Sequence, residues 1–79
     1  MSKGQIYARI AAIVTTLAET GGGPESSIYL ALGMDMSLWT TLKCILLENG
    51  LMTCEGYWCE LTGKGASLAE QCNAALAAR

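Results

Sequence analysis

Histidine and phenylalanine are missing from this 79-residue chain, and proline occurs once. Without histidine the sequence offers no nucleophile–base pair of the usual kind and no Cys₂His₂ zinc site. The run Gly21-Gly22-Gly23-Pro24 lacks the lysine and the spacing of a phosphate-binding loop. Carboxylates paired at a useful spacing for acid–base chemistry are lacking as well. We therefore expect no enzyme activity and no cofactor.

Basic residues are also few, with five Lys and Arg against seven Asp and Glu, which gives a net charge of −2. The five are scattered along the chain. A DNA-binding domain normally has a clustered basic face, because phosphate neutralisation supplies much of its affinity. The charge therefore disfavours double-stranded DNA as a partner, although a dimer could gather Lys43 and Lys64 on one face.

Long apolar runs are absent. The segment from Ile10 to Leu17 is interrupted by two threonines and is too short to span a membrane. The first residues, MSKGQIYARI, lack the apolar core and the cleavage site of a signal peptide. We expect one cytoplasmic domain over residues 1–79, outside any membrane. Its hydrophobic fraction of 52% allows it to fold alone or to bury surplus apolar surface in a partner.

Four cysteines are present: Cys44, Cys54, Cys59 and Cys72. A disulfide framework would require a secretory context, of which the sequence shows no sign. The closest pair is separated by four residues, unlike the two Cys-x-x-Cys pairs that are usual in a structural zinc site. We interpret the cysteines as small buried apolar residues, with a metal or redox role as the alternative.

The stretch from Pro24 to Thr62 predicts a helix, a turn, a second helix and a hairpin. Gly33 and Gly50 bracket the second helix, since glycine takes the left-handed conformation that ends helices at no steric cost. Asp35 is placed to cap this helix, which should run from about Met36 to Asn49. Its apolar residues recur at helical spacing: Leu38, Trp39, Leu42, Ile45 and Leu46.

After Gly50 the apolar period drops to two, which predicts a two-stranded hairpin. Glu55-Gly56 is a candidate two-residue turn, and it would pair Cys54 with Tyr57. In this register one face of the hairpin is apolar or weakly polar and should cover the core. That face consists of Met52, Cys54, Tyr57, Cys59 and Leu61.

Further helices are expected on both sides of this stretch. An amphipathic helix near the start should end at Thr20 and the glycines that follow. Pro24 suits the first turn of the next helix, where its missing N–H costs nothing. The residues expected to face the core are Ile6, Ile10, Ile13, Val14 and Leu17 in the first helix, and Ile28, Ala31 and Leu32 in the second.

The last helix should begin near Lys64 or Gly65. Its alanines give it a strong helix propensity and a flat surface that permits close packing. That surface could pack on the first helix of the same chain or on a second copy, so a homodimer is one of two alternatives. The expected stripe consists of Leu68, Ala69, Cys72, Ala75 and Leu76.

This order of elements resembles a winged helix-turn-helix domain. The matching residues are Leu32-Gly33, Gly50-Leu51 and the run Leu61-Thr62-Gly63-Lys64-Gly65 that closes the hairpin and opens the last helix. The resemblance covers nearly the whole chain. It implies an α+β fold with a three-helix core, a two-stranded hairpin wing and a C-terminal helix. It is less specific for function, because winged helices bind DNA, RNA or proteins.

In such a domain the third helix would be the recognition helix in the major groove of DNA. The resemblance then implies a transcriptional regulator whose third helix meets DNA through its outward residues. Against this, the face has no Arg, Asn or Gln for a bidentate base contact, and the Glu55-Gly56 tip has no basic residue. The candidate DNA-binding residues are Met36, Ser37, Thr40, Thr41, Lys43 and Lys64.

The alternative is an acidic winged-helix module that binds another protein, such as an adaptor or a phage-type inhibitor of DNA-binding machinery. Trp and Met are enriched in the cores of protein interfaces. Met34 and several other apolar residues are expected to be exposed. The candidate protein-binding residues are Leu30, Met36, Leu47 and Trp58. The resemblance favours the DNA-binding regulator, and the acidic charge favours the protein-binding module. Of the two, we expect the regulator.

Overall fold

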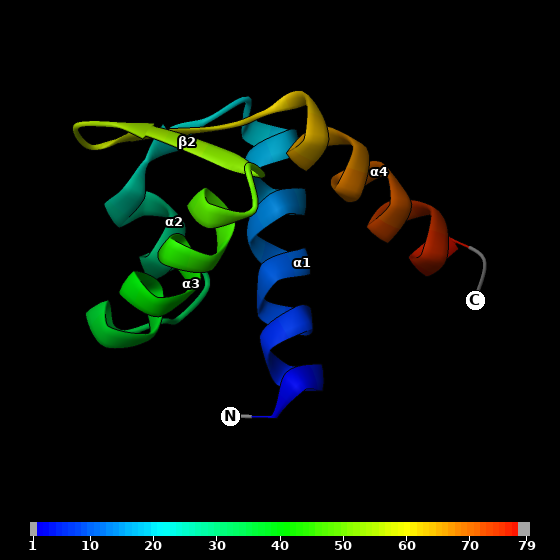
Figure 1. Cartoon of the computed structure of the whole chain (residues 1–79), viewed down its shortest axis with the longest axis horizontal. Helices are drawn as coiled ribbons and strands as arrows, with labels where there is room; N and C mark the ends of the chain where they lie inside the picture. Colours follow the sequence, from blue (N-terminus) through cyan, green and yellow to red (C-terminus); the bar gives the residue numbers. More distant parts are fainter. Residues whose placement is uncertain (1, 78–79) are drawn as a thin grey trace.

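The computed structural model describes residues 2–77, over which the chain forms an α+β fold of four helices and one three-stranded antiparallel sheet (Figure 1). Helix α1 lies between the α2–α3 pair and α4, and the sheet lies across one end of the helices (Figure 1). The strand order is β1-β3-β2. The elements are α1 (Lys3–Thr20), β1 (Gly23–Pro24), α2 (Glu25–Ala31), α3 (Met36–Glu48), β2 (Met52–Glu55), β3 (Trp58–Leu61) and α4 (Gly63–Ala77).

Helix α1 begins at a capping box in which the Ser2 hydroxyl accepts from the Gln5 backbone N–H and the Gln5 side chain accepts from the Ser2 backbone N–H. It ends at Gly21, which has a φ of 75°. The predicted apolar stripe is confirmed: Ile10, Ile13, Val14 and Leu17 are buried, and Ile6 packs against them half-buried.

The turns on both sides of α3 also agree with the prediction. Gly33 and Gly50 have φ values of 66° and 68°, so both take the left-handed conformation. The Asp35 carboxylate accepts from the Leu38 backbone N–H at 2.8 Å and caps α3. Helix α3 then buries Trp39, Leu42 and Leu46 and leaves Ile45 half-buried.

The edge strand β1 was not predicted. Gly23 and Pro24 pair antiparallel with Cys59 and Trp58, so the sheet has three strands and not two. Pro24 consequently precedes α2 as its N-cap and does not belong to the first turn. A two-residue strand is too short to show a period of two. Proline is tolerated there because an edge strand has one side without ladder partners.

The hairpin turn lies one residue further along the chain than predicted. Gly56 and Tyr57 form the turn, so Cys54 pairs with Cys59 and not with Tyr57. The Tyr57 side chain is 82% exposed, and its expected place on the inner face is wrong. Its backbone carbonyl accepts from the Glu25 N–H at 2.8 Å, which ties the hairpin tip to the start of α2.

The rest of the predicted inner face survives this shift. Moving the register by two residues keeps every side chain on its face of the strand. Met52 and Cys59 are buried, and Cys54 and Leu61 are half-buried against the core. The outer face carries Thr53, Glu55, Trp58 and Glu60.

Other predictions of burial are wrong as well. Cys44, interpreted as buried with the other cysteines, is exposed on α3. Met34, expected at the surface, is only 5% exposed, because its N–H donates to the Tyr29 carbonyl and turns the α2–α3 connection inward. Ala31 is exposed at the end of α2, where the helix stops before completing another turn.

Helix α4 packs against α1, which is the intrachain arrangement of the two alternatives. Ala69 is buried, and Leu68 and Cys72 are half-buried, but Ala75 is exposed and does not belong to the packed stripe. The Leu76 side chain lies outside the described residues. The homodimer stays a prediction. Among residues 2–77 no single helix has the length and apolarity needed to cross a membrane, and α2 with α3 meets that test only as a pair bent by 115°.

Candidate functional site

The outward face of α3 exposes most of the candidate DNA-binding residues. Met36, Ser37, Thr40 and Thr41 are all exposed, as is Cys44. The Thr40 hydroxyl donates to the Met36 carbonyl at 2.7 Å, and the Thr41 hydroxyl donates to the Ser37 carbonyl at 3.1 Å. With their protons held by the helix backbone, both hydroxyls present lone pairs to solvent. Phosphate oxygens are themselves acceptors, so these threonines are poorly prepared for phosphate contacts.

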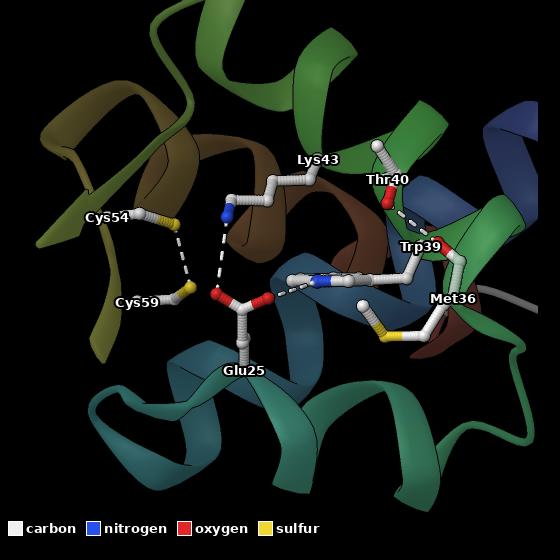
Figure 2. Close-up of polar contacts among 7 residues, drawn as sticks. All are labelled: Glu25, Met36, Trp39, Thr40, Lys43, Cys54 and Cys59. Carbon is white, nitrogen blue, oxygen red and sulfur yellow. Dashed lines mark hydrogen bonds and ion pairs between the residues drawn. The ribbon is translucent and has the colours of Figure 1, made fainter. Parts of the chain in front are cut away.

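Lys43 is held inside the fold. Its ammonium donates to the Glu25 carboxylate at 3.2 Å, and both side chains are half-buried (Figure 2). This hydrogen bond is the main reason why the pKa of Lys43 is raised. The position on α3 that could neutralise a phosphate is therefore already neutralised by Glu25.

The Glu25 carboxylate connects α2 to α3. One of its oxygens accepts from Lys43, and the other accepts from the indole N–H of the buried Trp39 at 3.2 Å (Figure 2). Glu25 opens α2, while Trp39 and Lys43 belong to α3. The sequence did not reveal this role, because the three residues are 14 and 18 positions apart. Their contact depends on how α2 crosses α3.

The other candidate basic residue, Lys64, is exposed. Its ammonium donates to the Asn49 carbonyl at 2.9 Å, at the C-terminus of α3. A cation there is favoured by the unpaired carbonyls of the helix end. Lys3 and Arg9 belong to α1, and Arg79 lies outside the described residues. The structure thus gives Lys43 and Lys64 separate intramolecular partners.

Carboxylates, in contrast, are exposed around α3 and the hairpin. Asp35 precedes α3, Glu48 ends it, Glu55 adjoins the hairpin turn and Glu60 lies on β3. Each would face repulsion from a nearby phosphate. The Glu60 carboxylate also accepts from the Trp58 indole N–H at 2.9 Å. A DNA duplex laid along α3 and the hairpin would therefore meet more negative than available positive charge.

The four candidate protein-binding residues are all accessible. Leu30 is 69% exposed, Met36 54%, Trp58 49% and Leu47 39%. Met36 and Leu47 share one stripe of α3 with Thr40 and Cys44, since residues spaced by three and four positions lie on the same face of a helix. We call this set the α3 stripe. Trp58 lies on the outer face of the hairpin, and Leu30 lies on α2.

Tyr57 is an exposed aromatic side chain that the sequence interpretation assigned to the core. It stands at the hairpin turn, next to Trp58, and it was assigned to the core because the predicted turn was one residue early. Glycine can also occupy the first position of a two-residue turn, and this alternative placement of Gly56 was the sequence signal for Tyr57 at the tip. The φ of 62° at Gly56 agrees with it.

The cysteines Cys54 and Cys59 face each other across the hairpin. Their sulfur atoms are 2.7 Å apart, Cys59 is fully buried and Cys54 is half-buried (Figure 2). Burial, together with the hydrogen bond to Cys54, raises the pKa of Cys59 to about 12. Among residues 2–77 no three Cys, Asp or Glu side chains group closely enough to hold a metal ion.

We expect the buried Cys59 thiol to make the fold sensitive to alkali. Above pH 9.0, the ordinary pKa, the unfolded chain loses the Cys59 proton while the folded chain keeps it up to about pH 12. The free energy of unfolding should therefore fall with pH in this window, by at most about 1.4 kcal/mol per pH unit. Urea unfolding between pH 8 and 11 measures this slope.

Two variants identify the source of that slope. Cys59→Ala should flatten it, and Cys44→Ser, which changes an exposed thiol, should leave it unchanged. Lys43 adds a loss of the same sign at higher pH, because the stability given by its raised pKa disappears as the ammonium deprotonates. An unchanged slope in Cys59→Ala would refute the assignment.

Comparisons with known proteins assign no family to the chain. The chain matches no protein-family model, and it matches no curated protein.

Proposed function

We propose that this chain is a winged-helix module that binds another protein through the α3 stripe and the exposed aromatic residues of its hairpin. The winged-helix assignment is supported by the sequence of elements: α2, a glycine turn, α3 and a hairpin that leads into α4 follow one another as the resemblance implies. The three-stranded sheet and the packing of α1 against α3 are compatible with it.

The observation that carries the choice of a protein partner is the ion pair between Lys43 and Glu25. Lys43 is the one basic residue of α3, and in this pair its charge is matched inside the fold. What α3 and the hairpin expose instead is apolar surface with carboxylates around it: Met36 and Leu47 on α3, Tyr57 and Trp58 on the hairpin.

The chemistry of this surface defines the partner. The exposed Trp, Tyr and Met side chains fit an apolar hollow, since Trp and Tyr carry much of the binding energy in protein interfaces and Met is enriched there. The carboxylates of Asp35, Glu48 and Glu55 fit a rim of Lys and Arg. Nucleic-acid-binding proteins have basic surfaces of this kind, which keeps DNA-binding machinery among the partners we propose.

A DNA-binding regulator is the second candidate. It is favoured by the exposure of Ser37, Thr40 and Thr41 on the helix that occupies the recognition position. A dimer would have to supply the basic charge that one copy lacks, so this candidate requires self-association as well as DNA binding.

One pair of measurements separates the two candidates. We expect no retardation of a random DNA duplex at low salt, even with the protein at high micromolar concentration. A protein partner recovered on the immobilised chain and then purified should bind wild type, and Met36→Glu should weaken that binding at least about tenfold. Trp58→Ala should weaken it as well.

The matched control is Tyr7→Glu, because Tyr7 is 67% exposed on α1, away from the α3 stripe in sequence and element. This variant should bind the partner as wild type does. Equal loss of binding in Met36→Glu and Tyr7→Glu would refute the docking surface. Retardation of DNA that Thr41→Glu abolishes would establish the second candidate in its place.

A further inference from the structure

We propose that Cys54 and Cys59 are a thiol-oxidation site at which a small disulfide, such as oxidised glutathione, converts the two thiols into a reversible crosslink across the hairpin. The proposal is independent of the docking function. It depends on the register of β2 and β3, which places the two cysteines directly opposite each other.

The geometry is close to that of a bond. The two sulfur atoms are 2.7 Å apart, against about 2.0 Å in a disulfide. Directly opposite residues of antiparallel strands have Cα atoms about 4.5–5.5 Å apart, which lies inside the range that disulfides span. The crosslink therefore needs a small movement of two side chains and no change of register.

The environment assigns a different step to each thiol. Cys54 is half-buried whereas Cys59 has no exposed surface, so we assign the exchange with the external disulfide to Cys54 and the second exchange to Cys59. The Lys43 ammonium lies on the α3 side of the pair and Glu25 on the α2 side (Figure 2). The ammonium lowers the pKa of Cys59, but burial, the hydrogen bond with Cys54 and the Glu25 carboxylate raise it by more, so Cys59 keeps its proton until the second exchange.

The reaction balances as two exchanges. The Cys54 thiolate attacks one sulfur of the external disulfide, forms a mixed disulfide and releases one glutathione thiolate, which takes up the Cys54 proton from solvent. Cys59 then attacks the Cys54 sulfur, the Cys54–Cys59 bond forms, and the second glutathione thiolate leaves with the Cys59 proton. Two protein thiols are oxidised and one glutathione disulfide is reduced to two thiols.

The other two cysteines allow a clean test. Cys44 is exposed on α3 and Cys72 is half-buried on α4, so both are replaced in a Cys44→Ser, Cys72→Ser protein that keeps only the pair. After incubation of this folded protein with excess oxidised glutathione, we expect its intact mass to fall by two hydrogen atoms. The mass should carry no glutathione, and dithiothreitol should restore it.

A matched protein tests the role of Cys54. When Cys54→Ser is added to the double variant, Cys59 should remain a free, unmodified thiol as long as the chain is folded, because no exposed sulfur is left to start the exchange. Circular dichroism confirms folding before either reaction. A lasting glutathione adduct on the pair protein, or two thiols that stay reduced, would overturn the proposal. Glutathione on Cys59 in the folded Cys54→Ser protein would overturn the assigned order.

Discussion

Gly65→Ala is expected to lower the free energy of unfolding by about 3 kcal/mol, a large part of the stability of a domain of this size. Gly65 is buried in the first turn of α4, where the chain leaves the sheet. A Cβ atom placed on it would overlap the backbone carbonyl of Leu51 and crowd the Leu61 side chain. The carbonyl cannot turn away freely, because it accepts from the Thr62 N–H at 3.1 Å.

Gly63→Ala is the matched control, two residues earlier in the same helix. Gly63 is exposed, and a Cβ atom there would meet nothing within 4 Å. Alanine should stabilise the helix slightly at this position, by up to about 1 kcal/mol. Urea midpoints of the two variants measure the difference. If the urea midpoints of both variants shift equally, the contact between Gly65 and the Leu51 carbonyl does not determine the stability of the fold.

Gly65 also shows what kind of information the sequence contained. Its place in the Leu61–Gly65 run supported the resemblance, but the reason for a glycine there is the distance to Leu51, which is fixed only when α4 packs beside the start of β2. Gly33 and Gly50 differ from Gly65, because their own left-handed backbone conformation requires glycine. Each also lies where a helical pattern of apolar residues ends. Local requirements were predictable; close approaches between distant segments were not.

The hairpin also combines a predictable local pattern with contacts to distant segments that the sequence did not predict. Alternation along Met52–Leu61 identified which side chains face the core, since a period of two survives any shift of the register by two residues. Glycine at position 56 allowed two placements of the turn, and the observed one is accompanied by contacts outside the hairpin, namely the pairing of Pro24 with Trp58 and the hydrogen bond from Glu25 to Tyr57. Neither contact has a signal in the local sequence.

For the candidate site, the sequence predicted which side chains are exposed, but it did not predict which charged side chains form ion pairs. Helical spacing placed Met36, Ser37, Thr40 and Thr41 at the surface, where the structure has them. Lys43 was also expected near the surface, as a cation available to DNA. Its actual partner is Glu25, 18 residues earlier, and that contact changes which function the face of α3 supports.

Trp39→Ala is expected to cost about 3–5 kcal/mol of unfolding free energy, enough to leave a small domain largely unfolded at 37 °C. Trp39 has no exposed surface, and its ring centre lies 6.1 Å from that of Tyr29. The substitution leaves a cavity between α2 and α3, and it also removes the indole donor from Glu25, which then keeps only Lys43 as a side-chain partner.

Two milder variants separate these contributions. Trp39→Phe retains much of the ring volume but removes the N–H, and it should cost about 1–3 kcal/mol. Glu25→Gln keeps an oxygen that accepts from Trp39 and loses the charge opposite Lys43; because both partners are half-buried, we expect about 1 kcal/mol or less. Denaturant titration followed by far-ultraviolet circular dichroism ranks all three. A Glu25→Gln loss as large as that of Trp39→Ala would mean that the ion pair, and not the packing of the indole, holds α2 against α3.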